Sequence, residues 1–208
     1  FQKKKVQNLK KRIKILVVGG TGFIGYHLAN RCLSLGWDVT SISARKPRNL
    51  RKLKKVKYII CDIAKKHSFR NKIPNKLDYV VNLGGYVDHS NKKKTFNTHF
   101  LGSANLANYF IKNKIKKFVQ IGSGGEYGNL KSPQRETSIT KPLSVYSKSK
   151  YKASKNLLKL FNRKKFPATI LRLYQVYGPK QDINRFIPII INGCLKNLNF
   201  TIKSRMAA

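Results

Sequence analysis

A cluster of glycines in the stretch VVGGTGFIGYHL constrains the fold of this chain more than any other feature. An apolar run at 13–18 precedes the cluster, and apolar side chains at helical spacing follow it over 23–35. A strand, a glycine turn and a helix in this order are typical of a phosphate-binding loop in a parallel α/β sheet. We expect Gly19 to permit the tight turn, Gly22 to let a pyrophosphate approach, and Gly25 to let helix and strand pack closely.

Beyond this loop, apolar strand-like runs and helical segments continue to residue 176. The strand-like runs are 38–43, 58–62, 77–85, 116–123 and 168–176, and the helical segments are 96–113 and 144–161. This alternation predicts right-handed crossovers and a parallel sheet that helices cover on both faces. We therefore expect one doubly wound α/β domain, a Rossmann fold, over 13–191, with a basic arm at 1–12 before it.

The charge is extreme: 45 Lys and Arg residues face 7 Asp and Glu residues, which gives a formal net charge of +38. Such a charge favours polyanionic partners, and a polyanion-binding protein is the alternative that it supports. The basic residues are scattered in short clusters, however, and no helix-turn-helix, RNA-binding or zinc signature accompanies them. We therefore interpret them as a solvated surface and expect no nucleic-acid partner.

The cysteines and the apolar runs exclude two further classes. Cys32, Cys61 and Cys194 are widely spaced and form no CxxC pair, as expected for reduced thiols of a cytoplasmic protein without a metal site. No apolar run approaches the ~20 residues that a membrane-spanning helix needs. We expect a cytoplasmic protein with no membrane partner.

The end of the second predicted strand bears on the choice of cofactor. An Asp or Glu at this place holds a ribose with a free 2′-OH, whereas a 2′-phosphate calls for a cation. Here Ser43 takes the acidic place, and Arg45, Lys46 and Arg48 follow it. The pattern favours NADP(H) over NAD(H) slightly, and both stay open.

A second motif, YSKSK, supplies candidate catalytic groups. Tyr146 and Lys150 are four residues apart and therefore share one face of the predicted helix. An ammonium beside a phenol lowers its pKa, so that the tyrosine could exchange a proton near neutral pH. Ser123 ends the fifth predicted strand at the same edge of the sheet, where its hydroxyl could hydrogen-bond a substrate oxygen.

Together these motifs resemble the extended short-chain dehydrogenase/reductases, and within them the NAD(P)-dependent epimerase/dehydratase group that acts on nucleotide sugars. The resemblance covers about residues 13–190 and is carried by GGTGFIG, CDI, VVNLGG, SGGEYG, YSKSK and LRLYQVYGPKQ. It implies hydride transfer between a nicotinamide and a sugar carbon, most often C4. Tyr146 would be the acid/base, Lys150 its pKa modulator and a ribose ligand, and Ser123 the orienting donor.

The resemblance also implies contacts to the cofactor, to the substrate and to a second subunit. The implied cofactor-binding residues are Gly19, Gly22, Phe23, Ile24, Gly25, Arg45, Asp62, Ile63, Leu83, Gly84, Tyr146 and Lys150. Gln175 and Arg185 would bind the sugar nucleotide, although Gln175 stands where the family usually has Asn. The helices beside the fourth and fifth strands would form a homodimer interface.

Two departures from the family pattern affect the predicted reaction. Family dehydratases carry an Asp-Glu pair after the Ser or Thr, whereas this chain has Gly124 and Gly125 there, with Glu126 one position late. We therefore prefer a 4-keto reductase slightly over a 4-epimerase, and both over a dehydratase. His99 stands where the family has an Asn, three residues before Gly102, and we interpret it as a packed helix histidine.

The third departure is length. The chain ends earlier than family members commonly do, so we expect most of the C-terminal substrate lobe to be missing, with 192–208 as its remnant. Arg172, Tyr177 and Arg185 would then face the place of that lobe, or each would be a structural or solvated residue. A domain that binds NADP(H) without turnover is the alternative that this departure leaves open.

Overall fold

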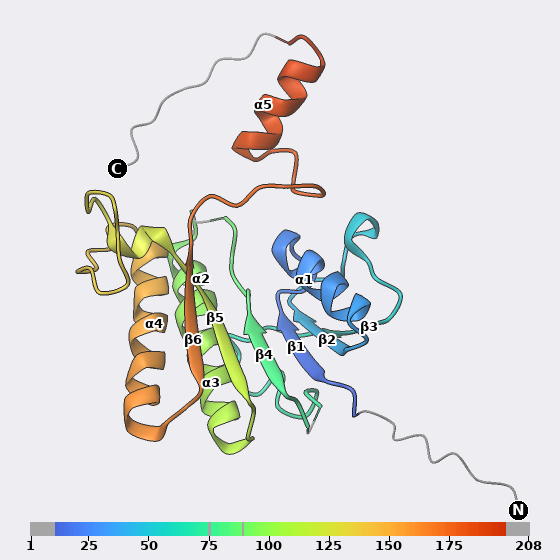
Figure 1. Cartoon of the computed structure of the whole chain (residues 1–208), viewed down its shortest axis with the longest axis vertical. Helices are drawn as coiled ribbons and strands as arrows, with labels where there is room; N and C mark the ends of the chain where they lie inside the picture. The colour runs from blue at the N-terminus through green and yellow to red at the C-terminus, as the bar shows by residue number, and fades with distance from the viewer. Residues whose placement is uncertain (1–10, 75, 89, 199–208) are drawn as a thin grey trace, which may run out of the picture.

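The computed structural model describes residues 11–74, 76–88 and 90–198 (Figure 1). Most of the basic arm predicted at 1–12, and residues 199–208 of the predicted remnant, therefore lie outside the described residues. No helix in the described part of the chain is long and apolar enough to cross a bilayer.

Six parallel strands form one sheet in the order β3-β2-β1-β4-β5-β6. They are β1 (Lys14–Val18), β2 (Asp38–Ser43), β3 (Val56–Ile60), β4 (Tyr79–Asn82), β5 (Lys117–Ser123) and β6 (Ala168–Leu173). The order reverses beside β1, so the connections wind outward in both directions from the centre of the sheet. This is the doubly wound Rossmann arrangement that the sequence predicts.

The three predicted helices form, as α1 (Phe23–Ser34), α2 (Lys92–Phe96) together with α3 (Gly102–Lys112), and α4 (Val145–Lys164). A further helix, α5 (Phe186–Leu195), was not predicted. A π-helical turn, Asn97–Leu101, joins α2 to α3 without a break, so the helix expected over 96–113 begins four residues earlier. Between β2 and β3 the structure has only a short 3₁₀ helix, Asn49–Arg51.

Alternate side chains of β1 build two cores, one on each face of the sheet. Leu16 and Val18 belong to the larger core, which α3 and α4 cover through side chains such as Leu106 and Leu157. The smaller core lies under α1. It is formed by Ile15, Val17, Ala29, Cys32, Val39 and Val56. Continuous apolar strands are therefore required at the centre of the sheet, where both faces are buried.

The prediction that helices cover both faces of the sheet fails at β6, on the face that α1 covers elsewhere. Thr169 and Leu171 of β6 point away from the larger core, and Leu171 is 45% exposed. The reason is that α1 packs mainly on β1 and β2, at a distance from β6. Among the described residues, α5 does not replace it: it stands apart, beyond the end of the sheet at which β6 finishes (Figure 1).

Candidate cofactor and catalytic site

The glycine loop joins β1 to α1 at the centre of the carboxyl edge. Gly19 has a φ of +82°, which an L side chain rarely adopts, and Gly22 is the N-cap of α1. A Cβ on Gly25 would lie 2.3 Å from the carbonyl oxygen of Gly19, so only glycine allows this packing. The turn leaves the backbone N–H groups at the start of α1 without a side-chain cap, as an anion-binding helix terminus requires.

The backbone after β4 closes one side of this loop. A Cβ on Gly19 would lie 2.9 Å from the carbonyl carbon of Leu83 and 3.1 Å from the nitrogen of Gly84. Two sequence motifs predicted to line the cofactor, GGTGFIG and VVNLGG, are therefore in direct contact. Phe23 and Ile24 are half-buried, and a Cβ on Gly178, in the loop after β6, would lie 3.5 Å from the Phe23 ring.

Asp62 and Ile63 differ in how available they are to a ligand. One carboxylate oxygen of Asp62 accepts a hydrogen bond from the backbone N–H of Ala64 at 2.9 Å, which shapes the turn after β3. The side chain of Ile63 is buried, and it packs where Gly84 and Gly102 leave no room for a Cβ. Ile63 is therefore a packing residue in this structure.

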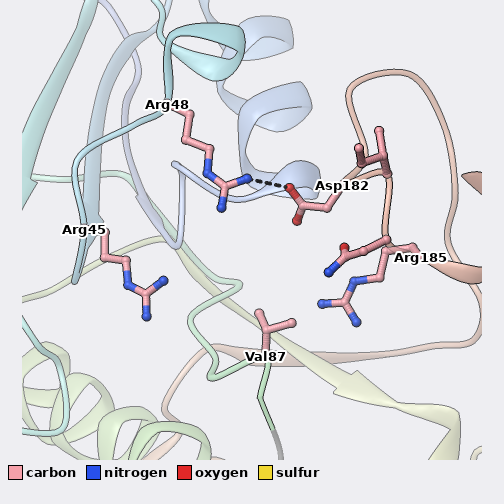
Figure 2. Close-up of a pocket in the computed structure, with 7 residues that line it drawn as sticks. Arg45, Arg48, Val87, Asp182 and Arg185 are labelled. Atoms are coloured by element: carbon pink, nitrogen blue, oxygen red, sulfur yellow. Dashed lines mark hydrogen bonds and ion pairs between the residues drawn. The ribbon is translucent and has the colours of Figure 1, made fainter.

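A pocket of about 480 Å³ opens between the β2–β3 loop and the loop after β6 (Figure 2). Its lining residues are Arg45, Arg48, Val87, Asp182, Ile183, Asn184 and Arg185. Asp182 forms ion pairs with Arg48 at 3.2 Å and with Arg51 at 2.5 Å. Arg45 and Arg185 extend toward each other from opposite sides of the pocket (Figure 2).

The pocket brings together two residues predicted for different ligands. Arg45 was expected at the cofactor and Arg185 at the substrate, yet both line the same pocket. Gln175, the other predicted substrate residue, is exposed and does not line it. The sequence does not reveal that Arg45 and Arg185 lie close together, because their proximity depends on the path of the loop after β6.

The three predicted catalytic residues do meet. Ser123 ends β5, and its side chain hydrogen-bonds that of Tyr146 in the first turns of α4. The ammonium nitrogen of Lys150 lies 5.8 Å from the centre of the Tyr146 ring and donates to the backbone carbonyl of Ile121 at 2.8 Å. Helical spacing and the carboxyl end of β5 thus place all three at one edge of the sheet, as predicted from the sequence.

The predicted direction of the Tyr146 pKa is wrong for this structure. Burial raises the pKa of Tyr146, the hydrogen bond with Ser123 lowers it, and the charge of Glu126 raises it. Lys150 is not among the groups that shift the pKa of Tyr146, and its ammonium group donates to the Ile121 carbonyl. Burial also lowers the pKa of Lys150 itself, to about 8.

A buried ion pair beneath these residues was missed. The Glu126 side chain is fully buried and accepts a hydrogen bond from Arg172 Nε at 3.1 Å. Arg172 also donates to the Tyr127 hydroxyl at 2.8 Å, which supports the structural role among the alternatives for this residue. The signal in the sequence was weak: one acidic residue in a glycine-rich turn, with its partner on another strand.

Two other buried polar groups support the site. His99 is 5% exposed, its ring packs edge-on against that of Tyr146 at 5.0 Å, and its Nε2 contacts the backbone of Tyr86. This is the packed helix histidine that we expected. Gln120 of β5 accepts hydrogen bonds from Asn82 of β4 and Ser103 of α3, which ties these two neighbouring strands to α3. Sequence patterns do not reveal such cross-element pairs.

The sequence pattern of the NAD dependent epimerase/dehydratase family matches residues 15–206. The chain belongs to this family. Members of the family that resemble it include the dTDP-D-glucose 4,6-dehydratase of Dictyostelium discoideum, which is 28% identical over 91% of this chain. The ADP-L-glycero-D-manno-heptose-6-epimerase of Brachyspira hyodysenteriae is 29% identical over 81% of this chain. The chain spans 50% and 56% of the lengths of these two relatives.

Solved structures of the family share the fold. The UDP-glucose 4-epimerase of Thermotoga maritima, determined with UDP-glucose, matches 92% of this chain with a TM-score of 0.85 and 26% identity. The UDP-glucuronic acid 4-epimerase of Bacillus cereus, determined in complex with NAD, matches 91% with a TM-score of 0.80 and 24% identity. The chain spans 66% of each of these two proteins.

Proposed function

We propose that this chain is the cofactor-binding and catalytic part of an NAD(P)-dependent enzyme that acts at C4 of a nucleotide-activated sugar. The observation that carries the proposal is the convergence of Ser123, Tyr146 and Lys150 at the edge of the sheet that also holds the glycine loop. Family membership and the nucleotide-sugar enzymes among the relatives support the same activity.

The residues present fit a dinucleotide. Gly19 and Gly25 let the loop pack closely against neighbouring backbone, and the loop leads into a helix terminus with uncapped N–H groups, which suits a pyrophosphate. When bound, the nicotinamide supplies or accepts the hydride. Tyr146 would then exchange a proton with the oxygen on the sugar C4, Ser123 would orient that oxygen, and Lys150 would hold the nicotinamide ribose.

Within this reaction class we favour a 4-keto reductase slightly over a 4-epimerase. A dehydration at C5 and C6 would require a free acid/base group after Ser123, where this chain has Gly124 and Gly125. Glu126 does not replace that group, because its carboxylate is fully buried against Arg172. For this chain we therefore disfavour a dehydratase activity like that of the Dictyostelium relative.

For the cofactor we favour NADP(H), the usual reductant of such enzymes. Ser43 stands where an acidic residue would hold a free 2′-OH, and Arg45 and Arg185 both extend into the neighbouring pocket (Figure 2). The Bacillus cereus structure contains NAD, so NAD(H) is the competing choice.

We also propose a cytoplasmic homodimer that pairs through α2, α3 and α4.

The deciding experiment is a turnover assay with NADPH and a 4-keto nucleotide sugar, run in parallel with a 4-epimerisation assay. Tyr146→Phe removes the proton-exchanging hydroxyl, so we expect turnover to fall by roughly 10²–10⁴-fold while cofactor affinity is kept. Tyr151→Phe, a tyrosine on the same helix, serves as the control and should leave turnover unchanged. Full turnover by Tyr146→Phe would contradict the role assigned here.

The same assay tests the alternative of a cofactor-binding domain without turnover. The chain spans 50% of the length of the Dictyostelium relative, so the assay is made on this part of the protein. Saturable NADPH binding with no turnover on any 4-keto or 4-hydroxy nucleotide sugar would support it, and turnover on one of them would exclude it.

A further inference from the structure

One of the 7 acidic residues of the chain has a fully buried carboxylate. Glu126 lies in the short 3₁₀ helix Gly124–Tyr127, directly after Ser123, and it is 0% exposed. Burying a carboxylate costs free energy unless ionic and hydrogen-bonding partners compensate. A buried carboxylate beside a catalytic serine therefore requires an explanation.

Glu126 has a partner for each of its oxygens. Oε1 accepts a hydrogen bond from the backbone N–H of Ser123 at 2.9 Å, and Oε2 accepts one from Arg172 Nε at 3.1 Å. A Cβ on Gly122 would lie 2.5 Å from Oε1, so the glycine at that position leaves room for the carboxylate. These contacts tie the end of β5 to β6 through one side chain.

The charge of this carboxylate also reaches α4. It raises the pKa of Tyr146 and the pKa of Lys150, in the latter case against the larger effect of burial. The other charged or titratable groups around the pair are Arg172 on β6, Tyr127 in the 3₁₀ helix and His99 in the π-helical turn. Of all these groups, Glu126 is the acidic one.

We propose that Glu126 is a positioning residue for the Ser123–Tyr146–Lys150 group. One oxygen fixes the backbone of Ser123, and the negative charge keeps Lys150 in its ammonium form inside a dry site. This inference rests on the proposed function, because that group is its catalytic set.

The ammonium form matters because only a charged lysine makes charge-assisted hydrogen bonds to a ribose hydroxyl or stabilises a developing phenolate. Near pH 8 a lysine whose pKa is about 8 is half deprotonated. Without the carboxylate this loss of charge would occur at lower pH. Arg172 is paired with the same carboxylate and carries the opposite charge, so removing it should have the opposite effect.

The test is the titration of the lysine side chains by NMR, which needs neither cofactor nor substrate. In the described residues, Lys150 is the lysine whose pKa is lowered, and Lys150→Arg identifies its signal by removing it. Glu126→Gln keeps an oxygen for the Ser123 N–H and removes the charge. We expect the midpoint of Lys150 to fall by about one unit or more, the usual effect of losing a nearby opposite charge.

Two further variants control the experiment. Glu136→Gln removes an exposed carboxylate of the same type and should leave the midpoint unchanged. Arg172→Gln removes the opposing cation, so we expect the Lys150 midpoint to rise, and this variant decides the question if Glu126→Gln fails to fold. An unchanged midpoint in a folded Glu126→Gln or Arg172→Gln protein would overturn the proposal and leave Glu126 a purely structural residue. Because turnover is not measured, this outcome is distinct from a failure of the proposed enzyme activity.

Discussion

At the scale of single residues, the buried ammonium group of Lys150 lowers the free energy of unfolding. It is 5% exposed, and burial lowers its pKa from the ordinary value of 10.5 to about 8. Such a fall corresponds to roughly 3 kcal/mol of lost stability wherever both folded and unfolded states carry the proton, which means below pH 8. The role proposed for Lys150, beside Tyr146 on one face of α4, would explain why a lysine is retained at this cost.

We therefore predict that Lys150→Met makes the protein more stable at pH 7. Removing the buried charge recovers the burial cost, and losing the hydrogen bond to Ile121 costs about 1 kcal/mol, so the free energy of unfolding should rise by roughly 1–2 kcal/mol. Between pH 8 and 10.5 the folded wild type loses the proton before the unfolded chain does, so wild-type stability rises and the difference should shrink.

Urea unfolding at pH 7 and at pH 9.5 measures both effects. Lys148→Met, at an exposed position of α4, is the matched control and should change the free energy of unfolding by less than about 0.5 kcal/mol. A destabilised Lys150→Met protein at pH 7, or a difference that grows with pH, would show that the burial of Lys150 is not costly.

At the scale of elements, the loop after β6 is attached to α1 and to the segment between β2 and β3. The carbonyl of Pro179 contacts His27 Nε2 of α1 at 2.8 Å, and Lys180 donates to the hydroxyl of Tyr26. Two residues later, Asp182 pairs with Arg51, whose side chain is 7% exposed. The loop thus forms one wall of the pocket and depends on these contacts for its position.

We predict that Asp182→Asn loosens this loop. The nearly buried Arg51 loses its ionic partner, which should cost about 1–3 kcal/mol of the free energy of unfolding. Backbone hydrogen exchange should accelerate over 178–185, while β1 stays protected. Asp38→Asn, which breaks the exposed pair with Arg12, is the control. Equal exchange over 178–185 in wild type and Asp182→Asn would refute this role of the ion pair.

At the scale of the whole molecule, the net charge of +38 attracts any polyphosphate. We predict that the affinities for NADPH and NADH both fall as salt rises, whereas the preference for NADPH persists because it depends on close contacts to Arg45. Arg45→Ala should weaken NADPH binding by roughly tenfold and leave NADH binding nearly unchanged.

Titrations followed by nicotinamide fluorescence at moderately high salt measure this preference. Arg163→Ala, an exposed substitution on α4, removes the same charge far from the pocket and serves as the control. Tighter binding of NADH by the wild type would leave the fold assignment intact and favour the 4-epimerase over the 4-keto reductase. Weak, unsaturable binding of both cofactors would count against the proposed use of the glycine loop.

The sequence by itself determined the order of strands and helices, the glycine turn and the shared edge of Ser123, Tyr146 and Lys150. These features are readable because each depends on local spacing: three glycines between a strand and a helix, and two residues four apart on one helix. The start of the helix expected over 96–113 and the coverage of β6 by helices were predicted less well, since both depend on what packs nearby.

Only the tertiary structure decided which distant residues meet. It joined Glu126 to Arg172, placed Arg185 beside Arg45, and turned the Lys150 ammonium toward the Ile121 carbonyl. The physical reason is that burial and charge proximity, which set these pKa values and ion pairs, arise from segments far apart in the chain. No pattern within a single segment records them.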